Sequence, residues 1–289
     1  MIPIVFSTDH NYIMPTGVTI LSLLKSSLTE QYRIYVIIAP DVTEEDKNLL
    51  REQVRICSSE SSIDFIEIGN EFESGFEIRG ISMACYYRLL IPWLLPQYDK
   101  VIYSDVDIIY QFGLREVFNT DLSNKYFGGV CPNAFNTGSI ASYIKRLGIN
   151  SHSYINSGFL IINSQLQRKD NLEVKFKQLA KKKFLFQDQD IINLVANNRI
   201  ELIDEMYNMS PSFIHHESHS NQKYTIHYSG IKPWDGFTFC WLEWWEIYKA
   251  SIFYDKSLYF KTSAKILSRK EFFKRLQRSV IYNLQKIFR

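Results

Sequence analysis

The feature that most restricts the fold is a regular alternation of short apolar runs with helical segments over the first hundred residues. The runs are rich in β-branched and aromatic residues, which predicts strands over residues 2–7, 33–39, 63–68 and 100–104. The intervening helices are predicted around the stripe Val18, Leu21 and Leu24, after a cap at Thr43, and over residues 82–90. This alternation indicates an α/β fold, in which helices cover both faces of a mixed, mostly parallel sheet.

The rest of the chain alternates less regularly. Residues 132–152 are rich in Pro, Asn, Gly and Ser and are predicted to form a surface excursion. A strand is predicted over residues 154–163, and helices over residues 172–183 and 188–197. Because no repeat or low-complexity linker occurs before residue 255, we expect one domain over residues 1–255 and a tail over residues 256–289.

Two aspartates stand at the end of the fourth predicted strand. Asp105 and Asp107 lie within an apolar stretch, and Asp9 follows the first predicted strand. Ligands of parallel sheets bind at the carboxyl ends of strands, so Asp9 and Asp105 are expected to face one crevice. Buried carboxylates need partners, and an Asp-x-Asp pair can converge on a hard divalent ion that in turn holds a diphosphate. The alternative is a polar strand end with two solvated aspartates.

The chain has no glycine-rich phosphate loop. Neither GxGxxG nor a Walker-type pattern occurs among its 12 glycines, so cations would have to hold the phosphates of a bound nucleotide. His227, Gly230 and Lys232 offer a nitrogen ligand for Mn²⁺, close backbone approach and a point charge for phosphate. The alternative is a buried histidine followed by a Pro-Trp turn.

Cysteine spacing and hydropathy indicate the cellular compartment of the protein. The four cysteines stand far apart without a CxxC pair, which favours reduced thiols. The first residues lack a basic n-region, and no apolar stretch approaches the roughly 18 residues that span a bilayer. We expect a cytoplasmic protein that is soluble or peripheral to a membrane.

Six segments, in this order, resemble glycosyltransferase family 8. They are residues 5–12 (VFSTDHNY), 81–89 (ISMACYYRL), 103–107 (YSDVD), 154–159 (YINSGF), 186–190 (FQDQD) and 227–234 (HYSGIKPW). The resemblance implies a retaining, UDP-sugar-dependent transferase with the GT-A fold, a Rossmann-like nucleotide-diphospho-sugar transferase domain. The likeness is to bacterial lipopolysaccharide and capsule galactosyl- or glucosyltransferases.

The resemblance assigns donor-binding roles to the matched residues. It implies Mn²⁺ (or Mg²⁺) bound by Asp105, Asp107 and His227. Uridine would contact Asp9 and Asn11. The diphosphate would be held by Gly230 and Lys232, although only Ile231 separates them here, where family members usually have two residues.

Four further residues are implied at the reacting centre. Arg88 would reach the donor sugar and the acidic pair, Asn156 and Asp188 would bind the sugar or position neighbours, and Gln189 would lie beneath the anomeric carbon. The alternatives are an ion pair for Arg88, a helix cap for Asp188 and backbone hydrogen bonds for Asn156. An amide is a poor nucleophile, so we favour front-side displacement, in which the leaving phosphate accepts the proton of the acceptor; Asp188 as a nucleophile stays open.

The last 34 residues are strongly basic. Residues 256–289 contain ten Lys and Arg and one acid, which makes them +9 and, since the total is +2, the rest of the chain −7. Apolar residues fall on one helical face, at Phe273, Leu276, Val280, Leu284 and Ile287. Such a tail predicts binding to an anionic membrane surface, at the inner face of the cytoplasmic membrane. The alternatives are a helix docked on the acidic body and nucleic-acid contact; we expect no nucleic-acid partner.

Together these features predict metal-dependent transfer of a hexose, galactose or glucose, from a UDP-sugar with retention of configuration. The expected acceptor is a glycan or lipid-linked glycan in cell-surface polysaccharide synthesis. Two other classes are compatible with the motifs: a catalytically silent sugar-nucleotide- or glycan-binding protein on the same fold, and a nucleotidyltransferase.

Overall fold

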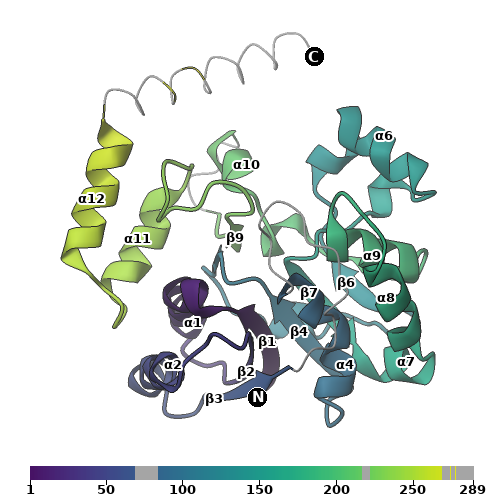
Figure 1. The fold of residues 1–289 in the computed structure, drawn as a ribbon, viewed down its shortest axis with the longest axis horizontal. Coiled ribbons are helices and arrows are strands. Elements are labelled where there is room, and N and C mark those ends of the chain that lie inside the picture. Colours follow the sequence, from purple (N-terminus) through teal and green to yellow (C-terminus); the bar gives the residue numbers. More distant parts are fainter. Residues whose placement is uncertain (69–83, 217–221, 269–273, 275–276, 278–289) are drawn as a thin grey trace.

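The computed structural model describes residues 1–68, 84–216, 222–268, 274 and 277. Its described strands form a seven-stranded sheet and a separate two-stranded ribbon (Figure 1). The sheet contains β1 (Ile2–Thr8), β2 (Tyr32–Ile38), β3 (Ser62–Glu67), β4 (Lys100–Ser104), β6 (Phe127–Gly129), β7 (Phe159–Asn163) and β8 (Ile200–Leu202). The ribbon pairs β5 (Ile108–Ile109) with β9 (Ile226–His227).

The sheet is mixed and mostly parallel, as predicted. Its order is β3-β2-β1-β4-β7-β6-β8, and only β7 runs antiparallel to its neighbours. The carboxyl ends of β1 and β4 therefore lie side by side at one edge of the sheet, and the residues that follow them share that edge. The four strands predicted in the first hundred residues are all present, within about a residue of the expected bounds.

Helices cover both faces of the sheet. The helices of the described chain are α1 (Ile13–Ser26), α2 (Glu44–Cys57), α3 (Ala84–Tyr87), α4 (Ile91–Leu94), α5 (Arg115–Phe118), α6 (Gly138–Arg146), α7 (Ser164–Lys169), α8 (Leu172–Ala180), α9 (Gln187–Ala196), α10 (Pro211–His216), α11 (Trp241–Lys249) and α12 (Lys256–Leu267). Ile4 and Phe6 of β1 face the core under α1 and α2, whereas Val5 faces the core under α3, α4, α8 and α9. This alternation of side chains gives the sheet two buried faces.

Several segments differ from the predictions in detail. The strand predicted over residues 154–163 is only β7, because residues 154–158 turn toward the end of β4 instead of extending the ladder. Residues 132–152 contain α6, which buries only Ile144 and so shows little helical periodicity. The helix predicted over residues 82–90 is α3 followed by a 3₁₀ turn, η2 (Arg88–Leu90); residues 82 and 83 lie outside the described residues. Thr43 caps α2 as expected, in a capping box with Asp46.

The ribbon begins where the chain leaves the main sheet. The Asp105 amide donates to the Gly158 carbonyl beside β7 (2.8 Å), and the Tyr228 amide donates to the Asp107 carbonyl beside β9 (2.9 Å). Ile108 pairs with His227 in antiparallel register. Asp105 and Asp107 therefore lie on one short connection, Asp105 beside the sheet and Asp107 beside the ribbon.

The C-terminal helices pack on an aromatic cluster. Trp244, Trp245 and Tyr248 of α11 are fully buried against α1 and β9. Tyr259 of α12 packs edge-on against Trp245, at 5.3 Å between ring centroids. Within the described ranges, no helix is both long and apolar enough to cross a bilayer. The apolar face predicted over residues 273–287 lies outside the described residues, and the division at residue 255 stays a prediction.

Candidate active site

The structure brings the three predicted metal ligands together. Asp105 and Asp107 flank the junction of sheet and ribbon, and the ribbon register places His227 beside both. His227 Nε2 lies 3.3 Å from Asp107 Oδ1 and 3.8 Å from Asp105 Oδ2. In the described part of the chain these residues form the one cluster with metal-ligand spacing, with ligand atoms within 4.8 Å of one another.

The donor set suits a divalent ion such as Mn²⁺. Two carboxylates and an imidazole nitrogen are borderline-hard ligands. Asp107 Oδ1 is buried and has no hydrogen-bond partner, although it faces His227. A buried carboxylate oxygen without a donor is costly, so this oxygen needs a cation. The residues fit the metal that the sequence predicts.

A glycine creates the room for this cluster. A Cβ atom at Gly158 would lie 2.3 Å from His227 Cε1 and 2.8 Å from Asp105 Oδ2. Real Cβ atoms do not approach other atoms so closely, so only glycine fits between these ligands. Gly158 belongs to a matched motif, but its contact with the ligands could not be read from the sequence.

Arg88 ties the acidic pair to α9. Its Nη2 lies 2.9 Å from Asp105 Oδ1, and its Nε lies 3.2 Å from Asp188 Oδ2. Its Nη1 donates to the Ser157 carbonyl at 2.7 Å, and the guanidinium lies over the Tyr103 ring. Burial disfavours the charged form, but Asp105 and Asp188 outweigh burial and raise the pKa of Arg88 above its ordinary value.

Lys232 lies on the opposite side of the acidic pair. Its ammonium hydrogen-bonds Asp107 Oδ2 and donates to the Tyr228 carbonyl at 2.8 Å. Burial lowers the pKa of Lys232, but Asp107 outweighs burial and raises it above its ordinary value. A Cβ atom at Gly230 would meet nothing within 4 Å, so the backbone here borders open space. Lys232 therefore reaches the acidic pair even with a single residue between it and Gly230.

Asp9 and Asn11 lie at the carboxyl end of β1, beside β4. Asp9 accepts from the Tyr12 amide at 3.2 Å and caps η1 (His10–Tyr12), while Asn11 is exposed. The Tyr12 ring packs edge-on against Trp234, 6.1 Å between centroids, just past Lys232. The strand register and this contact place the predicted uridine residues next to the predicted diphosphate residues.

The four residues predicted at the reacting centre are also neighbours. Asp188 and Gln189 lie in the first turn of α9 and are buried. Asn156 Nδ2 donates to Gln189 Oε1 at 3.0 Å, and Asp188 pairs with Arg88. Burial raises the pKa of Asp188, and Arg88 opposes this rise. Asp188 is thus inside the helix as an ion-pair partner, not its N-terminal cap.

Sequence reasoning missed Asn208. It follows η5 (Glu205–Tyr207), is 6% exposed, and its Oδ1 lies 2.7 Å from His227 Nδ1. Its Nδ2 donates to Asn156 Oδ1 at 2.9 Å. Asn208 lies outside all six matched segments, in an irregular connection, so no sequence pattern indicated it.

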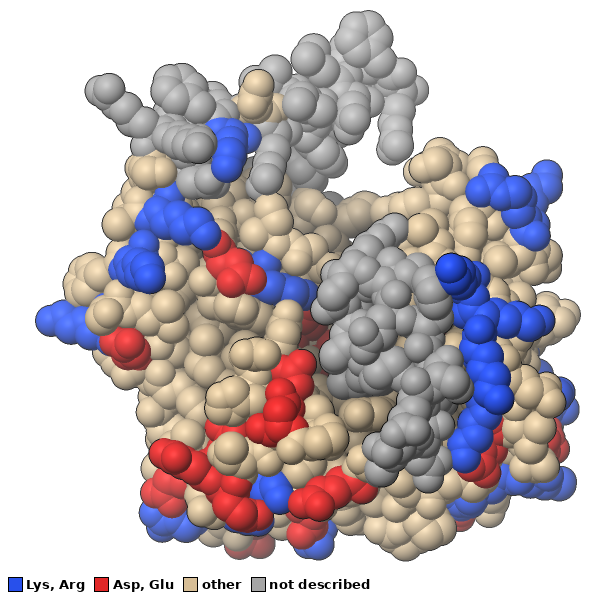
Figure 2. Space-filling view, viewed as in Figure 1, with Lys and Arg blue, Asp and Glu red and all other residues tan. Residues whose placement is uncertain are grey.

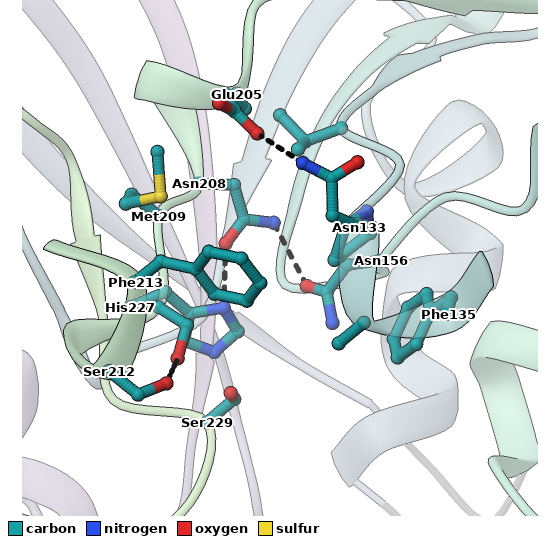
Figure 3. A pocket seen from close by; sticks show the side chains of 14 residues that line it. Asn133, Phe135, Asn156, Glu205, Asn208, Met209, Ser212, Phe213, His227 and Ser229 are labelled. Carbon is teal, nitrogen blue, oxygen red and sulfur yellow. Dashed lines mark hydrogen bonds between the residues drawn. The ribbon is translucent and has the colours of Figure 1, made fainter. Parts of the chain in front are cut away.

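A pocket opens beside His227 and Asn156. Its walls come from η3 (Asn133–Asn136), the η5 connection and α10, with Phe135 and Phe213 on opposite sides (Figure 3). Asn208 lies between His227 and Asn156 at the base of this pocket (Figure 3). A ligand in the pocket would therefore contact residues next to the metal-ligand cluster.

A profile of Glycosyl transferase family 8 matches residues 3–238. The chain belongs to glycosyltransferase family 8. The match contains all the predicted site residues, which agrees with the family resemblance of the six motifs.

Three bacterial proteins described as glycosyltransferases are moderately similar to the chain. A Haemophilus influenzae protein with the provisional description of a glycosyltransferase is 28% identical over 72% of this chain. The Escherichia coli lipopolysaccharide 1,2-glucosyltransferase is 25% identical over 78%, and the Salmonella typhimurium lipopolysaccharide 1,3-galactosyltransferase is 22% identical over 80%. The matches span 63%, 71% and 72% of the lengths of these three proteins.

Solved structures show the same fold. Galactosyltransferase LgtC, solved with donor and acceptor sugar analogs, superposes with a TM-score of 0.76 at 22% identity, over 90% of this chain and all of that one. The bifunctional glycosyltransferase WbbM gives 0.76 at 21% identity, over 91% of this chain and 52% of that one. The family 8 chain therefore has the GT-A fold.

Proposed function

We propose that the protein transfers a hexose, galactose or glucose, from a UDP-sugar with retention of configuration and with a divalent metal, Mn²⁺ or Mg²⁺. The acceptor is a glycan or lipid-linked glycan in cell-surface polysaccharide synthesis. The observation that carries the proposal is the cluster of Asp105, Asp107 and His227, with a buried carboxylate oxygen that needs a cation. Relatives named for lipopolysaccharide glucosyl and galactosyl transfer support the acceptor class.

The charges around the cluster suit a diphosphate leaving group. Three carboxylates, Asp105, Asp107 and Asp188, adjoin two cations, Arg88 and Lys232, so the protein alone is electronegative here. A metal bound by Asp105, Asp107 and His227 would neutralise charge on the leaving diphosphate. Lys232 adds a fixed positive charge at the same place, and Asp9 and Asn11 bind the uridine at the neighbouring strand end.

The groups beneath the sugar favour front-side displacement. Gln189 Oε1 already accepts from Asn156 Nδ2 at 3.0 Å and from the Ser157 amide at 3.2 Å, which makes a weak nucleophile weaker. Asp188 is buried and paired with Arg88. The acceptor hydroxyl then attacks from the side of the departing diphosphate, which takes its proton, while Asn156 and Gln189 orient the sugar.

The acceptor enters through the pocket beside Asn156 and His227. Aromatic walls at Phe135 and Phe213 suit the apolar faces of sugar rings, and polar side chains at its base suit hydroxyl groups. The pocket borders the side chains that orient the donor sugar, so an acceptor hydroxyl there has a short path to the anomeric carbon.

A donor panel tests the proposal. Purified protein is incubated with UDP-galactose, UDP-glucose and other UDP-sugars together with glycan acceptors, with Mn²⁺ or with EDTA, and UDP, pyrophosphate and the anomeric configuration of the product are measured. We expect metal-dependent UDP release from one hexose donor and an α-linked product from the α-linked donor. Donor-dependent thermal stabilisation without turnover would indicate a silent binding protein. Pyrophosphate release in a parallel incubation with UTP and a hexose 1-phosphate would indicate a nucleotidyltransferase.

We further propose that the C-terminal side of the protein lies on an anionic membrane at the cytoplasmic face. Ile266 of α12 faces the body, whereas Phe260 and Leu267 are 55% and 69% exposed among three exposed lysines, Lys256, Lys261 and Lys265. In Figure 2 basic residues lie at the upper left, where α12 lies, and along the right-hand side, while acidic residues gather at the lower left, where α2 and β3 lie. Exposed apolar side chains among lysines suit a surface of anionic lipid.

Vesicle sedimentation tests this placement. Because α12 packs on α11, the informative truncation is after Ser268 rather than before Lys256. We expect the full chain to sediment with phosphatidylglycerol vesicles and not with phosphatidylcholine vesicles, and both the truncation and Phe260→Ser/Leu267→Ser to weaken this binding. Leu28→Ser, at a residue 92% exposed outside α12, is the control. Equal sedimentation of all variants would refute the proposal.

A further inference from the structure

A chain of side-chain amides connects the metal-ligand cluster to Gln189. His227 Nδ1 lies 2.7 Å from Asn208 Oδ1, Asn208 Nδ2 donates to Asn156 Oδ1 at 2.9 Å, and Asn156 Nδ2 donates to Gln189 Oε1 at 3.0 Å. We call these four residues the amide relay; Figure 3 shows its first three members. The relay joins four segments: β9, the connection after η5, the turn before β7 and α9.

Two backbone amides determine which side-chain atoms of the relay donate and which accept. The Gly158 N–H donates to Asn156 Oδ1 at 2.9 Å, and the Ser157 N–H donates to Gln189 Oε1 at 3.2 Å. A backbone N–H can only donate, so an oxygen must occupy each of these two positions. The oxygen of Asn156 then faces Asn208, which must present its NH₂ group there and its own oxygen to His227.

This direction determines the tautomer of His227. Asn208 Oδ1 is an acceptor only, so His227 Nδ1 must carry a proton at 2.7 Å from it. In the neutral ring Nε2 is then unprotonated, and its lone pair faces Asp107 Oδ1 at 3.3 Å and Asp105 Oδ2 at 3.8 Å. Three electron-pair donors point at one place with no proton between them, which is the arrangement that a divalent cation requires.

We propose that Asn208 is a positioning residue that holds His227 as the Nδ1–H tautomer and keeps Nε2 available to the metal. Through Asn156 the same relay holds the oxygen of Gln189 in a hydrogen bond. The metal part of this proposal rests on the proposed function, whereas the tautomer is a property of the protein without metal or donor. Asn208 therefore couples the ligand that holds the leaving group to the side chain beneath the sugar.

Two substitutions at Asn208 separate polarity from packing. Asn208→Leu keeps a similar volume but removes the acceptor for His227 and the donor for Asn156. Asn208→Asp keeps an acceptor for His227 Nδ1–H but places a second acceptor against Asn156 Oδ1, so it preserves the histidine end of the relay only. If Asn208 only fills space, Asn208→Leu and Asn208→Asp should behave alike.

The direct measurement is the protonation site of His227 in metal-free protein. Protein with ¹⁵N-labelled histidine is studied by long-range ¹H–¹⁵N correlation at a pH where the ring is neutral, and His227→Gln assigns the signal. We expect Nδ1–H in the unsubstituted protein and in Asn208→Asp, and loss of this preference in Asn208→Leu. An Nε2–H ring in the unsubstituted protein would overturn the proposal, and this outcome does not depend on folding of any variant.

Mn²⁺ binding without donor is the second measurement. Titration calorimetry or electron paramagnetic resonance should show affinity reduced roughly 10–100-fold in Asn208→Leu and largely retained in Asn208→Asp. Asn133→Ala, which removes another amide of the same pocket, is the matched control and should bind Mn²⁺ normally. Unchanged affinity in Asn208→Leu would refute the positioning role. If the unsubstituted protein shows Nδ1–H and binds Mn²⁺ but turns over no UDP-sugar, the proposed function is wrong and the positioning role of Asn208 is still supported.

Discussion

Arg88 and Asp105 meet through only one of the two oxygens of the carboxylate. Arg88 Nη2 lies 2.9 Å from Asp105 Oδ1, and the Tyr103 hydroxyl donates to the same oxygen at 2.8 Å. Asp105 Oδ2 is thereby left facing His227. Arg88 thus orients the carboxylate, and the other oxygen is presented to the predicted metal position.

Replacement of Arg88 should affect both stability and metal binding. Arg88→Met leaves Asp188 buried without its cation, so we expect the free energy of unfolding to fall by about 3–5 kcal/mol in urea titrations. Arg88→Lys keeps one charge but cannot span Asp105, Asp188 and the Ser157 carbonyl together, so Mn²⁺ affinity should fall with a smaller loss of stability.

Arg199→Met is the control for this prediction, because Arg199 pairs with Asp170 at an exposed site, where an ion pair contributes little to stability. A double substitution, Arg88→Met/Asp188→Leu, should recover much of the stability lost in Arg88→Met. No recovery in the double variant would mean that the uncompensated charge of Asp188 is not the cause.

Asp107→Asn should abolish metal-dependent turnover of the UDP-sugar. Burial disfavours ionisation of Asp107, but the pKa of this carboxyl group lies below its ordinary value because positive charge, including that of Lys232, adjoins it, so the carboxylate is ionised at neutral pH. The neutral amide removes one anionic ligand. UDP release at several Mn²⁺ concentrations, and after EDTA treatment, measures the effect, with Asp64→Asn at an exposed ion pair as the control. Full activity with Mn²⁺ would contradict the metal assignment.

Gly158→Ala should eliminate Mn²⁺ binding while leaving a folded chain. The added methyl group would overlap His227 and Asp105, which must move apart to admit it. Calorimetric Mn²⁺ titration and circular dichroism measure the two effects. Gly236→Ala is the control, since a Cβ atom there lies at an ordinary 3.7 Å from Ile231. Normal Mn²⁺ affinity in Gly158→Ala would show that the ligands tolerate displacement.

Gln189→Ala should leave measurable transfer. If Gln189 orients the sugar without attacking it, removal of its amide reduces turnover but does not remove the route to product. The measurements are product formation at saturating donor and donor affinity by calorimetry. Complete loss of transfer with unchanged donor affinity would count against front-side displacement.

His10 should stabilise the protein in a pH-dependent way. His10 Nδ1 donates a hydrogen bond to Asp46 Oδ2 at 2.8 Å, and this bond raises the pKa of His10 above its ordinary value. The charged imidazole therefore favours the folded state below the unfolded pKa of about 6.5, and this contribution is lost as pH rises through the folded pKa. The melting temperature of His10→Gln should be lower than that of the unsubstituted protein near pH ~6 and equal to it near pH ~9. A pH-independent difference, or the same effect in the exposed control His152→Gln, would contradict this account.

Much of the fold could be predicted because local patterns determine it. β1, β2 and β4 are mostly apolar runs that are buried on both faces, and α2 carries its own capping box at Thr43. The end of β4 was also recognisable, since Asp105 and Asp107 interrupt an apolar stretch.

The rest depends on contacts between distant segments. The ribbon strands are two residues each, too short for a sequence signal, yet their pairing places His227 beside Asp107. Asn208 acts through a tertiary hydrogen bond from an irregular connection, and α6 has too few buried residues to show periodicity. The sequence motifs predict the three metal ligands, but only the pairing of β5 with β9 shows how these residues come together.

The pairing of β5 with β9 has a consequence for biosynthesis. During translation Asp105 and Asp107 emerge well before His227, and β9 must dock on β5 before the third ligand is in place. A prematurely terminated chain that retains the N-terminal strands therefore has only two of the three proposed metal ligands. Completion of the proposed metal site is thus a late event in synthesis, because its third ligand belongs to the last strand of the described residues.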